Sequence, residues 1–378
     1  MSFVMHKPLL MIPGPMDVPD EVLRRCGHQV FPHYDSGTDF PKFYHQLVEK
    51  TKYVFGLRDG DVFIPNGSGT TAVNMMIASL VTPDDDVLIM NNGGFGAYAE
   101  KNLKNLGIGF THVKGEHGTV IDPELVRDEM KRNRHRFIYL THNESSTAVV
   151  NPISPIGEIA REFDAFVLVD AVSGVGGVVI DMDDAGADVV AGASQKCLEL
   201  PPGLAPVAVG RRAWNYIEKM GNRRVPYILD FVAWKRAFID QHDWHPTPVT
   251  GATTMLYALD WVIDQIIAEG IENRQERFRA AGERLKKGLG ELGFRSGADP
   301  RYASPVVTEF VTPDGISGEA VRDYYLKKHN TMVGYGFRTN EKGVKTSFRI
   351  AHFGLASNHD RIDHMIEITR KYMNEEAK

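Results

Sequence analysis

The sequence predicts an α/β protein in which a mostly parallel seven-stranded sheet, covered by helices on both faces, is followed by a smaller α+β domain. Three observations lead to this prediction. Between about residues 39 and 210, seven short apolar runs rich in β-branched residues alternate with segments of helical periodicity. Parallel strands need such helical crossovers, which cover both faces of a sheet. After about residue 250 the alternation ends and longer helical stretches dominate.

The seven predicted strands are bounded by Gly, Asp or Pro, residues that end strands and begin turns. In chain order they are DVFI, DDVLIM, IGFTHV, RFIYLT, AFVLVD, DVVAGA and LAPVAV. The segments between them, such as TAVNMMIASL and PELVRDEMKRN, repeat apolar residues at helical spacing. Strands and helices therefore alternate through the larger part of the chain.

The C-terminal part predicts a different arrangement. Helices are expected over residues 252–268, 271–292, 318–328 and 358–374, and strands within SPVVTEFVT and TSFRIAHFG. We therefore expect an N-terminal arm over residues 1–16, a large domain over residues 17–265 and a small α+β domain over residues 266–378.

The composition excludes several classes of protein. The 378 residues are 43% hydrophobic and 24% charged, an ordinary globular mixture, and the formal net charge of -6 offers no basic surface for nucleic acid or anionic membranes. Only two cysteines, Cys26 and Cys197, are present, which favours a reducing compartment. No apolar run approaches the ~18 residues of a membrane-spanning helix, and MSFVMHKPLLMIPGP lacks the long apolar run of a signal peptide. We expect a soluble cytoplasmic protein.

A Gly-rich loop in IPNGSGTTAV joins a predicted strand to a predicted helix. Helix N-termini favour anions, and Ser68, Gly69 and Thr70 offer hydroxyl donors and close backbone approach. The stretch also fits the dinucleotide fingerprint, but that site needs an acidic residue after the second strand, where this chain has NNGG. A phosphate site and a purely structural turn both remain open for this loop.

Residues at the ends of two later strands favour the interpretation of the Gly-rich loop as a phosphate site. Asp170 ends the strand AFVLVD, and Lys196 follows the next strand, between apolar segments that suit a neutral amine. Alone, such an Asp is usually a cap and such a Lys a surface charge. Together with the Gly-rich loop they match a pyridoxal phosphate site. The helix terminus would bind the phosphate, Asp170 the pyridine nitrogen and Lys196 the aldehyde carbon, while Phe95 would stack on the ring or belong to the core.

Motifs along nearly the whole chain carry a family resemblance: MIPGPMDVP, NGSGTTA, LTHNESSTAVVNPI, LVDAVSGVGG, GASQKCLELPPGLA, AEGIENRQERF and SFRIAHFG. With these motifs the sequence resembles the alanine–glyoxylate and serine–pyruvate aminotransferases, class V of the fold-type I pyridoxal phosphate enzymes. The resemblance implies that Ser145 contacts the cofactor ring and the substrate, that Gln195 assists the phosphate and that Arg349 holds the substrate carboxylate. It also implies a homodimer in which Thr250 reaches the phosphate of the partner's cofactor.

Four residues depart from the family pattern, and these are Met16, Ala148, Thr247 and Ala351. Thr247 stands where several relatives supply a tyrosine to the phosphate, and we expect it to contact the cofactor. Met16 and Ala351 are expected to line the substrate pocket, so the resemblance does not specify the shape of the pocket at these two positions. Tyr34, with His33, lies in FPHYDSGTDF, which we expect to be a specificity loop.

The function that follows is transamination in two half-reactions with ping-pong kinetics. The resemblance and the single matched carboxylate-binding arginine favour alanine or serine as donor and glyoxylate or pyruvate as the 2-oxo acid acceptor. The 2-aminoethylphosphonate–pyruvate transaminases are the nearest alternative, and a lyase or racemase using the same cofactor stays open. Intact NGSGTTA argues against the pyridoxamine-using branch, and the position of Cys197 argues against a cysteine desulfurase. A metal hydrolase using His242, Asp243 and His245 lacks further ligands at convincing spacing.

Overall fold

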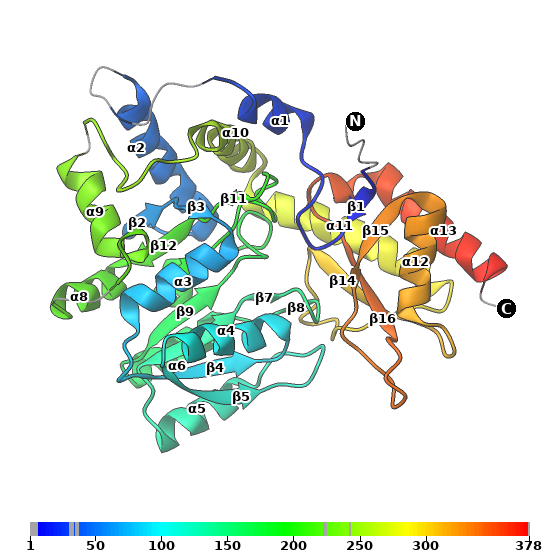
Figure 1. Ribbon diagram of the computed structural model, residues 1–378. Coiled ribbons are helices and arrows are strands. Elements are labelled where there is room, and N and C mark those ends of the chain that lie inside the picture. Colours follow the sequence, from blue (N-terminus) through cyan, green and yellow to red (C-terminus); the bar gives the residue numbers. More distant parts are fainter. Residues whose placement is uncertain (1–6, 30–33, 35–37, 222–224, 242, 377–378) are drawn as a thin grey trace.

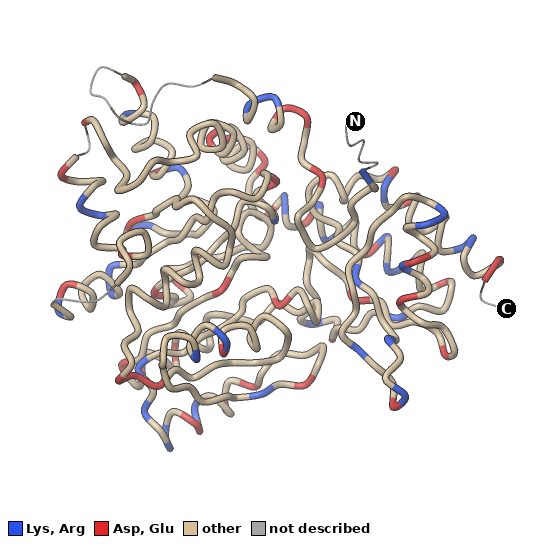
Figure 2. The backbone as a smooth tube through the Cα atoms, viewed as in Figure 1, with Lys and Arg blue, Asp and Glu red and all other residues tan. Residues whose placement is uncertain are grey.

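The computed structural model describes residues 7–29, 34, 38–221, 225–241 and 243–376. The chain forms a large domain on a seven-stranded sheet and a smaller domain on a five-stranded sheet, lying side by side (Figure 1). No helix among these residues has the length and apolar character needed to cross a membrane. Acidic and basic residues are interspersed over both domains (Figure 2).

The central sheet contains all seven predicted strands. In spatial order they are β2 (Gly60–Phe63), β12 (Val207–Gly210), β10 (Val189–Ala191), β9 (Phe166–Asp170), β6 (Phe137–Thr141), β4 (Asp86–Asn91) and β5 (Gly109–Lys114). The strands from β10 to β5 pair in parallel, whereas β12 pairs antiparallel with both β10 and β2. The prediction of a mostly parallel sheet is confirmed.

Helices cover both faces of this sheet because its strands alternate two apolar faces. Val167 and Val169 of β9 pack in the core beneath α2 (Phe40–Thr51), α5 (Pro123–Arg132), α6 (Ser154–Glu162) and α10 (Thr253–Glu269). Leu168 packs on the other side, in the core beneath α3 (Gly69–Leu80), α4 (Gly94–Asn105), α8 (Arg211–Lys219) and α9 (Phe231–Asp240). The remaining helices of this domain are α1 (Asp20–Cys26), α7 (Met182–Ala185), η1 (Lys52–Phe55) and η2 (Tyr227–Leu229).

Two short antiparallel strand pairs lie outside the central sheet of this domain. The first pairs β3 (Asn66–Gly67) with β11 (Gly203–Leu204), and the second pairs β7 (Asn143–Glu144) with β8 (Val149–Val150). The first pair adjoins the Gly-rich loop, and Ser145 lies between the strands of the second, so both pairs lie beside residues proposed for the site.

The small domain is built on the order β1 (Leu9–Met11), β15 (Thr331–Tyr335), β16 (Ser347–Ala351), β14 (Val307–Val311) and β13 (Arg295–Ser296). Its helices are α11 (Ile271–Gly290), α12 (Gly318–His329), α13 (His359–Glu375) and η3 (Gly354–Ser357). Strand β1 was not predicted. It brings the N-terminal arm into the sheet of the small domain by pairing in parallel with β15.

An apolar cluster lies between the two domains. It contains Met16 of the arm, Ala148 and Cys197 of the large domain, and Phe278 and Ala351 of the small domain. The two domains therefore share buried surface, which holds the arm and the small domain next to the carboxyl ends of the large-domain strands.

Candidate active site

Asp170 is the last residue of β9, where it pairs with Thr141 of β6 and Ala191 of β10. Its side chain is 6% exposed. One carboxylate oxygen accepts the backbone N–H of Val172 at 3.0 Å, and the other accepts the Tyr139 hydroxyl at 3.1 Å. Burial raises the pKa of Asp170 to about 6. A cationic ligand group beside this carboxyl would favour its ionised form.

Lys196 lies just past β10 and faces the N-terminal arm. Its Nζ donates a hydrogen bond to the carbonyl oxygen of Pro13. The arm turns directly over the lysine, because a Cβ on Gly14, whose φ is +108°, would lie 2.7 Å from the Lys196 Cδ. Burial, followed by the charge of Arg349, lowers the pKa of the Lys196 ammonium to about 8. The neutral amine is therefore far more populated near neutral pH than for an ordinary lysine.

A buried arginine holds the turns that follow these two residues. Arg274 of α11 is 6% exposed, and its Nε donates to the Gly176 carbonyl at 2.8 Å. Its Nη2 donates to the Cys197 carbonyl at 3.3 Å and to the Glu199 carboxylate. One side chain from α11 thus connects the turn after β9 to the turn after β10.

The Gly-rich loop forms the end of β3 and the start of α3. Gly67 has φ +140°, and a Cβ there would lie 2.1 Å from the Thr71 Oγ1, so only glycine fits. Ser68 is the N-cap residue but makes no capping hydrogen bond with its side chain, and Thr70 is exposed. The first turn of α3 consequently keeps donors for an anion.

Gly69 brings this helix terminus against the other two groups. A Cβ at Gly69 would lie 2.6 Å from both Val172 methyl carbons and 3.2 Å from the Ala193 Cβ. Val172 is two residues after Asp170, and Ala193 is three residues before Lys196. The N-terminus of α3 therefore packs directly on the two turns that carry the carboxyl group and the amine.

The terminus of α4 is organised by a buried carboxylate. Glu144 of β7 is 0% exposed, and one of its oxygens accepts the N–H groups of Phe95 at 2.9 Å and Gly96 at 3.1 Å. Its other oxygen accepts the Ser146 N–H at 3.0 Å, and the Ser146 hydroxyl accepts the Gly94 N–H at 2.7 Å. These bonds fix the backbone that carries the half-buried Phe95.

Several buried polar atoms at this edge lack a hydrogen-bond partner among the described residues. They are Thr141 Oγ1, His142 Nδ1, Asn143 Oδ1 and Gln195 Oε1. Burial lowers the pKa of His142 to about 4, so its ring is neutral at physiological pH. Buried polar atoms are nearly always paired, so a polar ligand fits here. The residues present match the donor and acceptor groups of pyridoxal phosphate.

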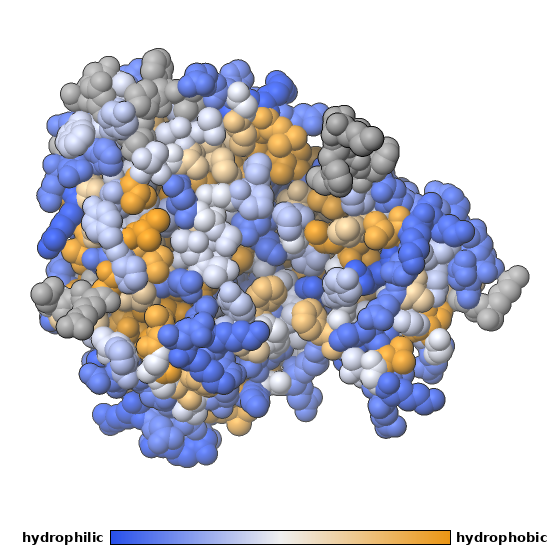
Figure 3. All heavy atoms as spheres, in the orientation of Figure 1, coloured by the Kyte–Doolittle hydropathy of each residue, from blue (hydrophilic) through white to orange (hydrophobic). Residues whose placement is uncertain are grey.

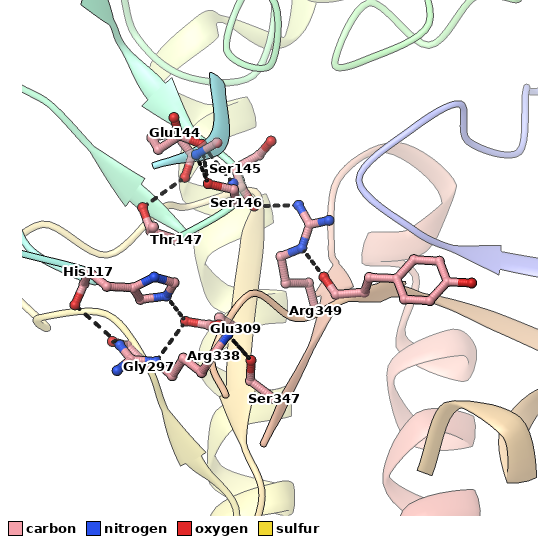
Figure 4. A network of polar contacts seen from close by, with 12 residues as sticks. His117, Glu144, Ser145, Ser146, Thr147, Gly297, Glu309, Arg338, Ser347 and Arg349 are labelled. Carbon is pink, nitrogen blue, oxygen red and sulfur yellow. Dashed lines mark hydrogen bonds and ion pairs between the residues drawn. The ribbon is translucent and has the colours of Figure 1, made fainter. Parts of the chain in front are cut away.

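Arg349 reaches from β16 of the small domain toward the large domain (Figure 4). Its Nε donates to the Tyr335 carbonyl at 2.6 Å, and its Nη1 donates to the Ser145 carbonyl at 2.7 Å. Burial lowers the pKa of the guanidinium to about 10, and nearby Arg322 adds to this effect. Ser145 itself is buried, and its hydroxyl accepts a hydrogen bond from Ser173 at 3.3 Å.

A second polar network beside Arg349 joins the domains (Figure 4). The carboxylate of Glu309, on β14, is bonded to His117 at 2.7 Å, Arg338 at 3.1 Å and Ser347 at 2.7 Å. Burial raises the pKa of Glu309, but the hydrogen bond and charge of His117, followed by the Ser347 hydrogen bond and the charge of Arg338, keep it below its ordinary value. Since His117 belongs to the large domain, this network fixes the small-domain sheet that presents Arg349.

Of the remaining predicted residues, Met16 and Thr247 are buried, and Thr250 lies beside the Gly-rich loop. Met16 is buried in the interdomain cluster, where its Cε methyl group packs toward Gly354. Thr247 is 2% exposed, and its hydroxyl donates to the Val249 carbonyl at 2.8 Å. The carbonyl of the exposed Thr250 accepts the amide of Asn66, beside the same chain's Gly-rich loop, at 2.6 Å.

The predicted specificity loop is described only in part. Tyr34 is 50% exposed and stacks on His245, with ring centroids 6.3 Å apart. His33 and His242, which the sequence analysis also named, lie outside the described residues.

Sequence reasoning missed four residues that organise this region: Tyr139, Glu144, Arg274 and Arg322. A signal existed for Glu144, because a charged residue within the apolar-flanked LTHNESSTAVV needs buried partners. Tyr139 similarly sits in a strand without other polar side chains before Thr141. The two arginines lie on helices whose spacing gives no indication that they face inward.

Comparison with known proteins gives the class of protein. The aminotransferase class-V model matches residues 14–365, so the chain belongs to this family and is an aminotransferase. Enzymes of this family depend on pyridoxal phosphate, which agrees with the donor set described above. The predicted fold-type I architecture is confirmed by this match and by the solved structures that resemble the chain.

Particular relatives are similar along almost their whole length. The chain is 33% identical to an uncharacterized aminotransferase of Methanocaldococcus jannaschii over 98% of this chain and 95% of the relative. It is 30% identical to the (S)-ureidoglycine–glyoxylate transaminase of Bacillus subtilis over 87% of this chain and 82% of the relative. The crystal structure of an alanine–glyoxylate aminotransferase from Nostoc sp. aligns with a TM-score of 0.91 at 27% identity, covering 99% and 97% of the two chains.

Proposed function

We propose that this aminotransferase uses pyridoxal phosphate to move an amino group from a small amino acid, alanine or serine, to glyoxylate or pyruvate. Relatives named for alanine–glyoxylate, serine–glyoxylate and ureidoglycine–glyoxylate transamination support the acceptor. The relative named for pyridoxamine–pyruvate transamination supports pyruvate as the alternative acceptor.

The proposed cofactor contacts follow from the donor set. Ser68, Gly69 and Thr70 would hold the phosphate with Gln195, and Phe95 would face the ring. Ser145 would lie beside the ring, as in the resemblance, and Thr247 and Thr250 would complete the phosphate end. When bound, the cofactor supplies an electron sink for the pair left when the substrate Cα loses its proton.

The protein groups divide the remaining work. Lys196, with its pKa near 8, would take the proton from the donor's Cα and pass it on within the site, and in the second half-reaction it would deliver a proton to the acceptor's Cα. Asp170, held by Val172 and Tyr139, would hold the ring nitrogen of the cofactor in its protonated form. Arg349 binds the carboxylate common to amino acids and 2-oxo acids, so one pocket serves both substrates and ping-pong kinetics follow.

One observation carries this proposal. The close packing of Gly69 on Val172 and Ala193 puts an uncapped helix terminus, a buried carboxyl group and a lysine with a lowered pKa at one sheet edge. Each group alone has common structural roles, but their convergence matches the phosphate, the ring nitrogen and the aldehyde of a single cofactor.

We further propose that the enzyme works as a cytoplasmic homodimer in which Thr250 approaches the partner's cofactor. Thr250 is exposed next to the Gly-rich loop, which suits a contact across a two-fold axis. The surface supports an interface as well, because the face in Figure 3 carries several hydrophobic patches.

The visible absorption spectrum with a panel of amino donors tests the function. The purified enzyme, supplied with pyridoxal phosphate, should show a protein-bound cofactor band that alanine or serine converts to the pyridoxamine form. The Lys196→Ala variant should lack this band, and the Lys114→Ala variant, changed at an exposed residue, should keep it.

Other results would redirect the assignment. A band converted by 2-aminoethylphosphonate alone would favour the aminophosphonate alternative. Release of products without accumulation of pyridoxamine phosphate would favour a lyase. An unchanged spectrum in Lys196→Ala would refute the cofactor site itself.

We also propose that Met16, Ala351 and Tyr34 shape the substrate site. Met16 and Ala351 belong to the same interdomain cluster, so they would act through the position of the small domain. Tyr34 would act from an exposed position against the substrate of the partner subunit.

A further inference from the structure

A cavity of about 340 Å³ lies beside the arm that covers Lys196. Pro13 and Gly14 of the arm line it, together with residues of α12, β15 and β16 of the small domain. The Pro13 carbonyl accepts a bond from Lys196, and a Cβ on Gly14 would touch the lysine, so the same stretch of the arm contacts both the cavity and Lys196. The cavity therefore borders the proposed active site.

Two arginines line this cavity. Arg349 is the residue proposed to bind the substrate carboxylate, and Arg322 comes from α12. The Arg322 Nε donates to the Val333 carbonyl at 3.3 Å, and its guanidinium carbon lies 3.3 Å from the centre of the Tyr335 ring. The Tyr335 carbonyl in turn accepts from Arg349. Neighbouring residues of β15 thus hold both guanidinium groups in place.

Neither arginine has a carboxylate within 4.0 Å among the residues that the structure describes. The nearby carboxylates are engaged elsewhere, with Glu309 bonded to Arg338 and Glu144 bonded to the amides of α4. Asp323, which also lines the cavity, is bonded to Lys327 at 2.7 Å. The cavity wall therefore carries two arginines that no carboxylate of the described residues contacts directly, although Asp323, Glu309 and Glu144 act on them from a greater distance.

Such a pair is unfavourable without an anion. Positively charged groups in a half-buried cavity normally find a carboxylate, and burial together with Arg322 already disfavours the charged form of Arg349. An anion bound between them would interact with both, and guanidinium groups bind carboxylates and phosphates through paired donors. One arginine suffices for the carboxylate of alanine, so the second needs another acidic group.

We propose that Arg322 binds a second acidic group, a carboxylate or a phosphate ester, on one amino acid and 2-oxo acid pair that this enzyme uses. This inference rests on the proposed transamination and extends its substrate range beyond alanine and serine. The α-carboxylate pairs with Arg349, and the acidic side chain extends into the cavity toward Arg322. Arg322 is then a determinant of specificity that leaves the reaction at Cα unchanged.

The test compares Arg322→Gln with Arg322→Lys and with Lys328→Gln. Lys328 lies on the same helix, is exposed and is not part of the cavity wall, so its variant matches the change in charge. Binding of succinate, inorganic phosphate and acetate is measured by calorimetry, with and without added pyridoxal phosphate. Rates of cofactor conversion are measured with aspartate, O-phosphoserine and alanine, and thermal unfolding establishes that each variant folds.

The wild-type protein should bind succinate or phosphate about tenfold or more tightly than acetate, since these ligands add a charge-assisted contact with Arg322. Arg322→Gln should remove this preference and lower kcat/KM for the acidic donor by about tenfold or more, with less than about a twofold change for alanine. Arg322→Lys should retain part of the preference, and Lys328→Gln should behave as wild type. Whether succinate and aspartate or phosphate and O-phosphoserine respond identifies the acidic group.

Two results would overturn the proposal. In one, the wild-type protein binds succinate and phosphate no better than acetate. In the other, Arg322→Gln weakens alanine as much as the acidic donors. Failure of the proposed function looks different, because then no donor converts the cofactor band, while anion binding that depends on Arg322 persists.

Discussion

Replacing Asp170 by Asn should stabilise the cofactor-free protein while weakening its hold on the cofactor. The pKa of Asp170 rises from its ordinary 3.8 to about 6 on burial. Because the folded-state value is the higher one, the stabilisation that this group provides is fully present below about pH 4 and is lost as pH rises through about 6. The difference corresponds to about 3 kcal/mol of unfolding free energy at pH 8.

Asn removes this cost without removing the hydrogen bonds. Its side-chain oxygen can still accept the Val172 N–H, and its amide can donate to the Tyr139 hydroxyl, where the carboxylate now accepts. The variant should therefore gain up to about 3 kcal/mol at pH 8 and almost nothing at pH 4. Its affinity for pyridoxal phosphate should fall, because a neutral amide does not favour a protonated ring nitrogen.

Urea unfolding of the two cofactor-free proteins at pH 4 and pH 8, followed by circular dichroism, measures this difference. Asp314→Asn, at an exposed position, serves as the control and should change neither value. The reasoning is wrong if Asp170→Asn is no more stable than wild type at pH 8, or if its gain is the same at both pH values.

Three further predictions concern the same sheet edge. Gly69→Ala would place a Cβ 2.6 Å from Val172, so the dissociation constant for pyridoxal phosphate, measured by fluorescence titration, should rise at least about tenfold. Gly290→Ala is the control, because nothing lies near its Cβ, and it should leave the dissociation constant unchanged. Equal effects of the two variants would contradict the steric argument. The rate of cofactor uptake by the cofactor-free enzyme should rise with pH with a midpoint near 8, because the neutral Lys196 amine reacts. A midpoint near that of an ordinary lysine, about 10.4, would refute this. Glu144→Gln should lower the unfolding free energy by about 2 kcal/mol, since one acceptor oxygen cannot satisfy the amides of Phe95, Gly96 and Ser146. Glu341→Gln, at an exposed position, is the control. An equally small change in both variants would show that the Glu144 carboxylate is not needed.

The large-domain fold was readable from the sequence because its signals are local. Each β-branched run is buried on two faces, so the run itself specifies a strand, and helical periodicity specifies the crossovers. The order of strands then brings the ends of β9 and β10 together, which is why Asp170 and Lys196 could be paired before any coordinates.

Other elements depend on contacts between distant segments. Strand β1 has only three residues and exists because Leu9 pairs with Thr331, so no local pattern marks it. Arg322 lies on a helix with many charged residues and reads as a solvent-facing side chain. The hydrogen bond from the Thr247 hydroxyl to the Val249 carbonyl is likewise set by the local fold and not by the motif. Such roles follow from tertiary packing, which spacing along the chain does not encode.

Helix α11 packs in the cores of both domains and connects them. Its first residue, Ile271, packs in the large-domain core, Phe278 packs between the domains, and Leu285 packs in the small-domain core. On the same helix, Arg274 donates a hydrogen bond to the carbonyl of Cys197, the residue next to Lys196. Any movement of the small domain is therefore coupled through α11 to the turn that carries Lys196. Substrate binding by the small domain and the orientation of the Lys196 amine consequently change together.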